Sequence, residues 1–180
     1  MENIYLIFVI ILFFLAFSDL IVGVANDAVN FLNSAVGSKA ASFKAILVVA
    51  SVGVIVGATF SSGLMEIARK GLFFPGQFSY NEVLIIFLAV MITDVILLDL
   101  FNTFGLPTST TVSIVFELLG ASVAVAVIKI TGNDQNIQEL GQYINSGKAL
   151  AIISGILVSV AIAFSFGSFI QYITRLLFTF

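Results

Sequence analysis

The sequence predicts an all-α polytopic membrane protein. Of its 180 residues, 60% are hydrophobic and only 9% are charged, and the mean hydropathy is +1.18. Soluble domains carry about 25% charged residues, so this composition excludes a soluble globular domain. Several apolar segments approach or exceed the length of about 20 residues that crosses the hydrocarbon core of a bilayer.

The same composition argues against several classes of function. The seven Lys and Arg residues are scattered in ones and twos, without the basic cluster that a nucleic-acid partner requires. Histidine and cysteine are absent, which removes thiolate metal sites and the usual proton carrier at neutral pH. No nucleophile–base pair can be recognised, so we expect neither an enzyme nor a cofactor other than bound sodium ions.

The first element is expected at residues 4–22. The N-terminus, MENIY, has no basic region of the kind that opens a signal peptide, so we expect a retained span. The polar stretch GVANDAVNFLNSAVGS follows at residues 23–38. If it is helical, Asn26, Asn30 and Asn33 share one face. Carboxamides at membrane depth are costly, so this stretch is the leading candidate for a binding site.

Further elements complete a single membrane domain over residues 1–180. Pro107 favours the start of a new helix after an interruption, and such a break is tolerated in a membrane only around a cavity or inside protein. The sequence predicts further spans at 45–67, 82–101 and 149–175, a broken or re-entrant helix at 102–130 and a polar connection at 131–148.

The hydroxyl run after Pro107 suits an anion. Ser109, Thr110 and Thr111 would form the first turn of a helix, where free backbone N–H groups meet the positive end of the helix dipole. No Lys or Arg occurs before Lys39 or between residues 71 and 128, so an anion in this region would have to be held without basic side chains.

Carboxylates and amide oxygens near the same region suit an alkali cation. The candidates are Asp27 with Asn26, and the acids Asp94 and Asp99 inside the third span. Bound cations would neutralise these acids beside an anion. The sequence therefore favours cation-coupled anion transport over a simple anion pore, in which rings of Arg or Lys are expected.

Plainer interpretations of each feature remain open. Hydroxyl-rich runs in membrane helices often hydrogen-bond only to the preceding turn. Asn and Asp side chains can serve to join helices. The acids, Glu117 among them, can lie nearer the membrane interface than the predicted spans place them. Under these interpretations the chain is a non-transporting membrane subunit.

Two stretches resemble the signatures of the inorganic phosphate transporter (PiT) family. VANDAVNFLNSAVGS, residues 24–38, is similar to GANDVANAFGTSVGS, and GLPTSTTVS, residues 105–113, is similar to G-x-P-[VI]-S-T-T-H-A. The resemblance implies a sodium- or proton-coupled phosphate symporter built from two inverted repeats. It implies phosphate or cation contacts at Asn26, Asp27, Asn30, Ser109, Thr110 and Thr111.

The chain departs from these signatures at several positions. Val112 stands where the second signature has His, which favours sodium over a proton as the coupling ion. Each signature occurs once, so the chain matches about one of two repeats. We therefore expect the N-terminal half of a longer transporter, or a chain that pairs with a second repeat or a copy of itself.

The sequence thus leads to one main hypothesis. The chain would take part in secondary active transport of inorganic phosphate with sodium, by alternating access, in the cell (inner) membrane. Phosphate would bind at Asn26, Asn30, Ser109, Thr110 and Thr111, and cations at Asp27, Asn26, Asp94 and Asp99. Another oxyanion such as sulfate is the alternative substrate, because hydroxyls and amides alone do not distinguish tetrahedral anions. The expected partners are phosphate, sodium or a proton, lipid and a second repeat, with no nucleic acid.

Overall fold

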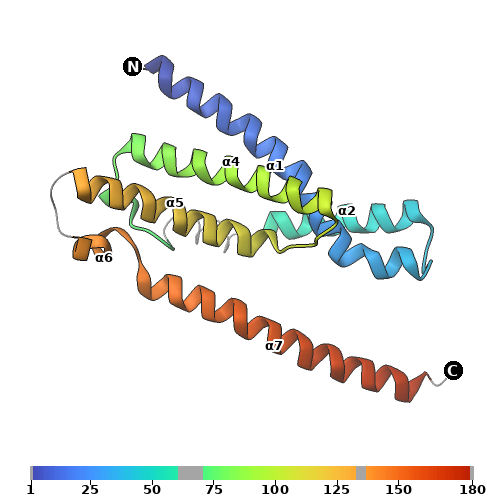
Figure 1. Cartoon of the computed structure of the whole chain (residues 1–180). Helices are drawn as coiled ribbons and strands as arrows, with labels where there is room; N and C mark the ends of the chain where they lie inside the picture. The colour runs from blue at the N-terminus through green and yellow to red at the C-terminus, as the bar shows by residue number, and fades with distance from the viewer. Residues whose placement is uncertain (1, 61–70, 133–136, 179–180) are drawn as a thin grey trace. The chain divides into compact units, whose positions relative to one another are not determined.

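The structure is a computed structural model that describes residues 2–60, 71–132 and 137–178 (Figure 1). Within these ranges every regular element is helical, apart from one isolated β-bridge. Five of the described helices are long and apolar enough to cross a membrane. The predicted class, an all-α polytopic membrane protein, is therefore confirmed. The chain divides into two compact units, Met1–Asn145 and Ser146–Phe180.

The first unit opens with one long helix, α1, Glu2–Gly37. Its 36 residues extend about 54 Å at 1.5 Å per residue, well beyond the ~30 Å of a bilayer core. The helix does not end at Val22, where we expected the first span to end. The polar stretch that follows contains no proline and continues the helix through to Gly37.

A short turn at residues 38–42 leads into α2, Phe43–Phe60. Lys39 adopts a positive φ of 53° in this turn. Almost all of α2 is exposed, with Ile46 its one buried residue, as expected for an apolar helix that faces lipid or another protein surface. The second predicted span, 45–67, continues past Phe60, and its residues 61–67 lie outside the described residues.

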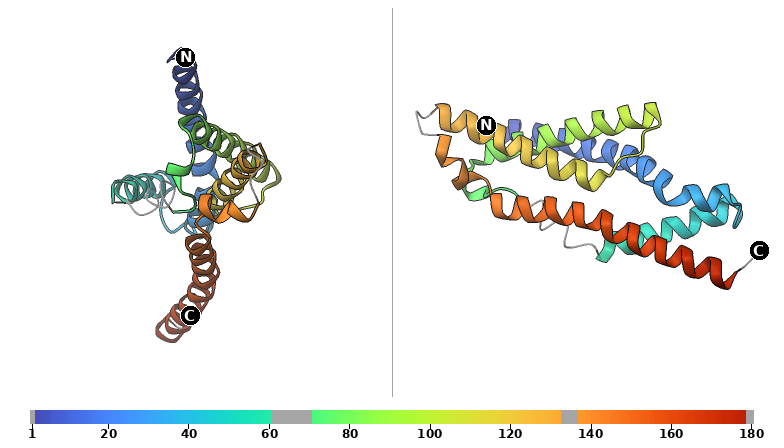
Figure 2. Two further views of the ribbon diagram at one scale, coloured as in Figure 1. Left: turned by 90° about the vertical axis from the view of Figure 1, so that its left-hand side faces the viewer. Right: turned by 60° about the horizontal axis from the view of Figure 1, so that its bottom comes forward.

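The helices α4, Tyr80–Phe104, and α5, Thr110–Gly132, form a hairpin (Figures 1 and 2). A capping box between Ser79 and Glu82 starts α4, and Gly105 ends it in the left-handed conformation at φ 66°. Residues 105–109 are not helical. The interruption predicted at Pro107 is thus present, although α5 is long and apolar enough to span by itself.

Helices α1 and α4 run parallel, and α5 returns antiparallel to both. Tyr5 packs edge-on against Tyr80 with ring centroids 5.4 Å apart, while Asn26 contacts Asn102 farther along both helices. The buried face of α4 repeats mostly every four residues, as helical geometry requires. It consists of Leu84, Ile86, Val90, Asp94 and Leu98.

An aromatic cluster lies at the end of the α4–α5 hairpin where α4 begins and α5 ends. Phe73 pairs with Ile144 in the isolated bridge, and Phe78 packs against both Phe73 and Tyr143. Lys129 forms an ion pair with Glu82 at 2.9 Å beside these rings. Here the polar connection contains the short helices η2, Ile137–Glu139, and α6, Leu140–Tyr143.

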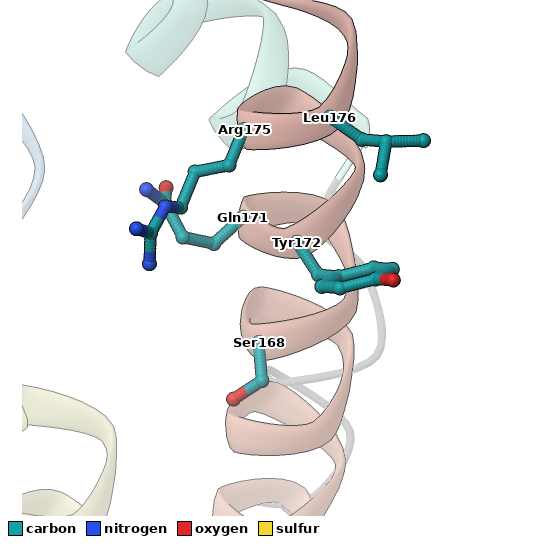
Figure 3. A pocket seen from close by; sticks show the side chains of 5 residues that line it. All are labelled: Ser168, Gln171, Tyr172, Arg175 and Leu176. Carbon is teal, nitrogen blue, oxygen red and sulfur yellow. The ribbon is translucent and has the colours of Figure 1, made fainter. Parts of the chain in front are cut away.

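The second unit consists of α7, Ser146–Leu177, which contains the predicted span 149–175. Near its C-terminal end a shallow hollow of about 440 Å³ is lined by residues of this helix alone (Figure 3). Figure 3 shows Ser168, Gln171 and Arg175 on one side of the helix, with Tyr172 and Leu176 on the other. Such Tyr and Arg residues near the end of an apolar helix are typical anchors at the membrane interface.

Candidate functional site

The centre of the candidate site is Asn26 of α1, whose side chain is only 2% exposed. Its Nδ2 donates to Oδ1 of Asn102 at 2.8 Å. Its Oδ1 accepts a hydrogen bond from the backbone N–H of Thr108 at 3.2 Å. Asn102 in turn donates from Nδ2 to the carbonyl oxygen of Val22 at 3.1 Å. One buried carboxamide therefore ties α1 to the end of α4 and to the break before α5.

Two neighbours of Asn26 extend this contact across the break. Asn30 donates from Nδ2 to the carbonyl oxygen of Thr108 at 3.2 Å. The hydroxyl of Thr110 donates to the carboxylate of Asp27, at 3.1 Å from Oδ2 and 3.4 Å from Oδ1. The two stretches that the sequence singled out, about 80 positions apart, thus form one polar site. Asn33, which we expected on the same face, is exposed.

The N-terminus of α5 faces this site with unused donors. The Ser109 hydroxyl accepts from the backbone N–H of Val112 at 3.4 Å and so caps the helix. The first N–H groups of a helix have no acceptor within it, and those of Thr110 and Thr111 are free of the helix's own ladder. Ser109 and Thr111 are exposed. These donors lie at the positive end of the α5 dipole, together with the Asp27 carboxylate.

A small hollow adjoins the Asn26–Asn102 pair. Its volume is about 70 Å³, room for roughly two water molecules at ~30 Å³ each. It is lined by Asn26, Val29, Phe101, Asn102, Gly105, Leu106 and Pro107. None of its lining residues belongs to α5, and the Ser109 and Thr111 hydroxyls at the start of α5 are exposed outside it.

The remaining predicted acids lie elsewhere. Asp94 is 1% exposed and lies close to Asp19 of α1 and Glu117 of α5. Asp99 is exposed, and no hydrogen bond in the described part of the chain joins it to the site around Asp27. The structure therefore brings together Asn26, Asp27, Asn30, Ser109 and Thr110, but not the two acids of the third predicted span.

Sequence reasoning assigned neither Asn102 nor Asp19 to a site. The signal was present in the spacing, since Asp19 precedes Asp27 by eight residues and Asp94 precedes Asn102 by eight. Eight residues are just over two turns of an α-helix, which keeps both members on nearly one face, about 12 Å apart. On α5, Thr110 and Glu117 are seven residues apart. The three helices therefore present two polar layers separated by roughly 10–12 Å.

Five apolar helices and a polar helix break held by hydrogen-bonded carboxamides define a multi-pass membrane protein. Both signature-like stretches of the sequence lie in this one site. The chain belongs to the phosphate transporter family, whose model matches residues 23–179. The family resemblance seen in the two motifs is thereby confirmed, and membership in a transporter family agrees with the expectation that the chain is not an enzyme.

Similar proteins occur in Thermococcus kodakarensis and Pyrococcus abyssi. The chain is 36% identical over 108 residues to a protein of Thermococcus kodakarensis, covering 59% of this chain and 27% of that protein. It is 30% identical over 148 residues to a protein of Pyrococcus abyssi, covering 81% of this chain and 33% of that protein. Both carry phosphate permease as an assigned name. The chain thus spans a third or less of the length of these relatives. No solved structure matches it.

Proposed function

We propose that the chain is part of a secondary transporter that moves inorganic phosphate across the cell (inner) membrane together with sodium, by alternating access. The observation that carries this proposal is the position of the N-terminus of α5. Thr108, just before this helix, and Thr110, its first residue, are hydrogen-bonded to Asn30 and Asp27 of α1, respectively. Membership in the phosphate transporter family supports the choice of substrate.

Phosphate would bind to the hydroxyls of Ser109 and Thr111, the first-turn N–H groups of α5 and the carboxamide of Asn30. Hydrogen bonds to an anion at a helix N-terminus gain from the dipole and from the unused donors there. Asn26 lies beneath this surface, and both ends of its carboxamide already have partners. We therefore assign Asn26 to positioning Thr108 and the start of α5.

The Asp27 carboxylate makes a coupling cation necessary in this proposal. It lies at the same helix N-terminus and would repel a phosphate anion at short range. Neither α1 nor α4 nor α5 up to residue 128 contains a Lys or Arg. A sodium ion beside Asp27 and the Thr110 hydroxyl would supply hard-cation chemistry between the two negative groups. We therefore assign the cation to Asp27 rather than to Asp94 or Asp99.

Asp27 also favours phosphate over sulfate, the alternative oxyanion. Inorganic phosphate carries a proton at neutral pH and can donate it in a hydrogen bond to a carboxylate, whereas sulfate carries none. A site that offers a carboxylate acceptor as well as several donors therefore suits phosphate better, because phosphate can donate a hydrogen bond to that acceptor and sulfate cannot. Unlabelled sulfate in excess over labelled phosphate should leave uptake nearly unchanged.

The open approach to the site calls for a second surface. Asn30, Ser109 and Thr111 are exposed, and the chain spans only a third or less of its relatives. In the proposal, a second repeat or a second copy of this chain covers these groups and completes the binding site. Lipid would cover the apolar sides of α2 and α1, which expose residues such as Phe60, Phe13 and Val49.

The test is uptake of labelled phosphate into proteoliposomes that contain the full-length transporter, with and without an inward sodium gradient. We expect sodium to accelerate uptake and Asp27→Asn to abolish the acceleration. Glu139→Gln, an acid of the polar connection, is the matched control. If sodium has no effect in the unmodified protein, the coupling proposal is wrong. If Asp27→Asn leaves phosphate binding nearly unchanged but damages assembly, the residue joins helices, as a non-transporting subunit would require.

A further inference from the structure

A second polar cluster lies about two helical turns from the phosphate site, and the proposed function makes no use of it. It contains one acid from each of three helices: Asp19 of α1, Asp94 of α4 and Glu117 of α5. The carboxyl groups of Asp19 and Glu117 both lie near that of Asp94. Asp94 is therefore the central member of the cluster.

The oxygens of this cluster lack donors. Asp94 is 1% exposed, and neither of its carboxyl oxygens has a hydrogen-bond partner among the described residues. One oxygen of each flanking acid, Asp19 Oδ1 and Glu117 Oε2, is buried in the same unpartnered state. Glu117 Oε1 accepts from the Ser113 hydroxyl at 2.8 Å. Four orphaned oxygens thus remain, two on the central acid and one on each neighbour.

A proton between two carboxyl groups satisfies one oxygen on each side. Two shared protons would therefore satisfy all four oxygens, one between Asp19 and Asp94 and one between Asp94 and Glu117. Like-charged carboxylates that share a site retain protons for this reason. An unpaired carboxylate in a low-dielectric interior is otherwise so costly that it becomes neutral.

Other ways to neutralise the cluster are poorly supported. No Lys or Arg occurs on α1, on α4 or before residue 129 on α5. The nearest described base along α5, Lys129, is 12 residues from Glu117 and already pairs with Glu82. In the described ranges, no group of three or more His, Cys, Asp or Glu side chains is arranged to hold a metal ion.

The cluster also lies where a membrane proton site is expected. Asp19 is at the centre of the 36-residue α1, and Asp94 is near the centre of α4. Acids at membrane depth that face other helices commonly carry protons in pumps and transporters. We propose that Asp19, Asp94 and Glu117 form a proton-binding site that exchanges a proton with water during the transport cycle.

This inference rests on the proposed function for its role in transport, but not for its existence. When the cluster is accessible to water, hydronium gives a proton to one of its carboxylate oxygens, and water on the accessible side takes it back. No bond other than the O–H bond forms or breaks. Phosphate uptake would then depend on pH through a site two turns away from the sodium and phosphate groups.

The experiment is infrared difference spectroscopy of the full-length transporter in lipid vesicles over a range of pH, in H₂O and in D₂O. Protonated carboxyl groups give a C=O stretching band that shifts in D₂O. We expect such a band in the unmodified protein and its loss in Asp94→Asn, whose neutral carboxamide has nearly the same shape. Glu139→Gln, which removes an acid outside this cluster, should leave the band unchanged.

Four further outcomes decide the proposal. A second variant, Glu117→Gln, should weaken the same band, which protects the test if Asp94→Asn fails to fold. A band identical in both variants and the unmodified protein overturns the proposal. Removal of the band by sodium at constant pH, as a saturable effect, also overturns it, because the cluster would then hold a cation. If the band behaves as expected but no phosphate uptake occurs, the proposed function fails and the proton site stands.

Discussion

The carboxamides of Asn26 and Asn102 are hydrogen-bonded at 2.8 Å across 76 positions of sequence. Through this pair the polar face of α1 is fixed to the last turn of α4, immediately before the break that starts α5. Asn26 also accepts from the backbone of Thr108, so the position of the α5 N-terminus depends on one buried side chain. A family signature that looks like a ligand set is, in part, the support of a helix junction.

Replacement of Asn26 by alanine should therefore cost stability as well as transport. The substitution removes the partners of Asn102 Oδ1 and the Thr108 N–H, which are both partly buried. A fully buried unsatisfied group costs about 1–3 kcal/mol, so the cost for each of these groups lies below that range. We expect a lower midpoint of thermal unfolding for the full-length transporter and a loss of phosphate uptake. Asn33→Ala, on the exposed side of the same helix, is the control and should change neither. Equal stability of the two variants would contradict the structural role.

Much of the fold could be predicted because composition and hydrophobic segments alone specify membrane helices. The break at Pro107 was also visible, since proline restricts the residue before it and starts the next helix. The length of α1 could not be predicted, because the polar residues 23–38 look like the end of a span when their partners are unknown. The free-energy cost of burying these polar side chains is offset by hydrogen bonds to Asn102, Thr108 and Thr110, which belong to a distant part of the sequence.

Unknown long-range contacts also explain why the sequence did not separate Asp94 from the site around Asp27. Asp94 was a candidate for cation binding together with Asp27 because both are carboxylates in apolar surroundings. The relative register of α1 and α4 decides between one site and two, and that register is set by contacts such as Tyr5 with Tyr80. A single sequence does not reveal it. Once the register is known, the eight-residue spacing on both helices separates the acids from the phosphate site.

Thr110 is expected to govern affinity for phosphate. Thr110→Val keeps the shape of the side chain but removes the hydroxyl that donates to Asp27 at 3.1 Å. The carboxylate then loses a donor that disperses its charge, and repulsion of the anion at the α5 N-terminus increases. A hydrogen bond to a charged group is worth about 1.5–3 kcal/mol, so we expect the KM for phosphate to rise roughly tenfold or more.

Uptake kinetics at saturating sodium measure this KM directly. Thr131→Val, at the exposed opposite end of α5, is the matched control and should leave the KM unchanged. An unaltered KM in Thr110→Val would show that the hydroxyl serves only to hold the two helices together.

Gly105 should resist substitution for a purely conformational reason. It ends α4 at φ 66°, yet a Cβ added there would meet no heavy atom within 4 Å. Gly105→Ala is expected to destabilise the protein by about 1–2 kcal/mol, the cost of a left-handed residue with a side chain. Gly120→Ala on α5 adds a Cβ into equally open space but in a helix, where it should stabilise by roughly 0.5–1 kcal/mol. Unfolding in denaturant compares the two, and equal effects would exclude backbone strain as the cause.

Gly23 lies where the three helices of the site approach one another, and it offers a test of that convergence. A Cβ at this position would lie 3.7 Å from Leu98 Cδ1 and 3.8 Å from Thr110 Cγ2, which are ordinary van der Waals distances. Gly23→Ala should therefore fold and gain up to about 1 kcal/mol from the lost flexibility of a mid-helix glycine.

A larger side chain at the same position should have the opposite effect. Gly23→Leu would overpack the junction, at a cost of about 1–3 kcal/mol, and would push Thr110 away from Asp27. We expect weaker phosphate binding, measured as a higher KM for uptake, together with a lower unfolding midpoint. Gly53→Leu on exposed α2, where a Cβ meets nothing within 4 Å, should change neither quantity. If the two leucine variants behave alike, α1 does not meet α4 and α5 at Gly23, and the proposed site would lose its structural basis.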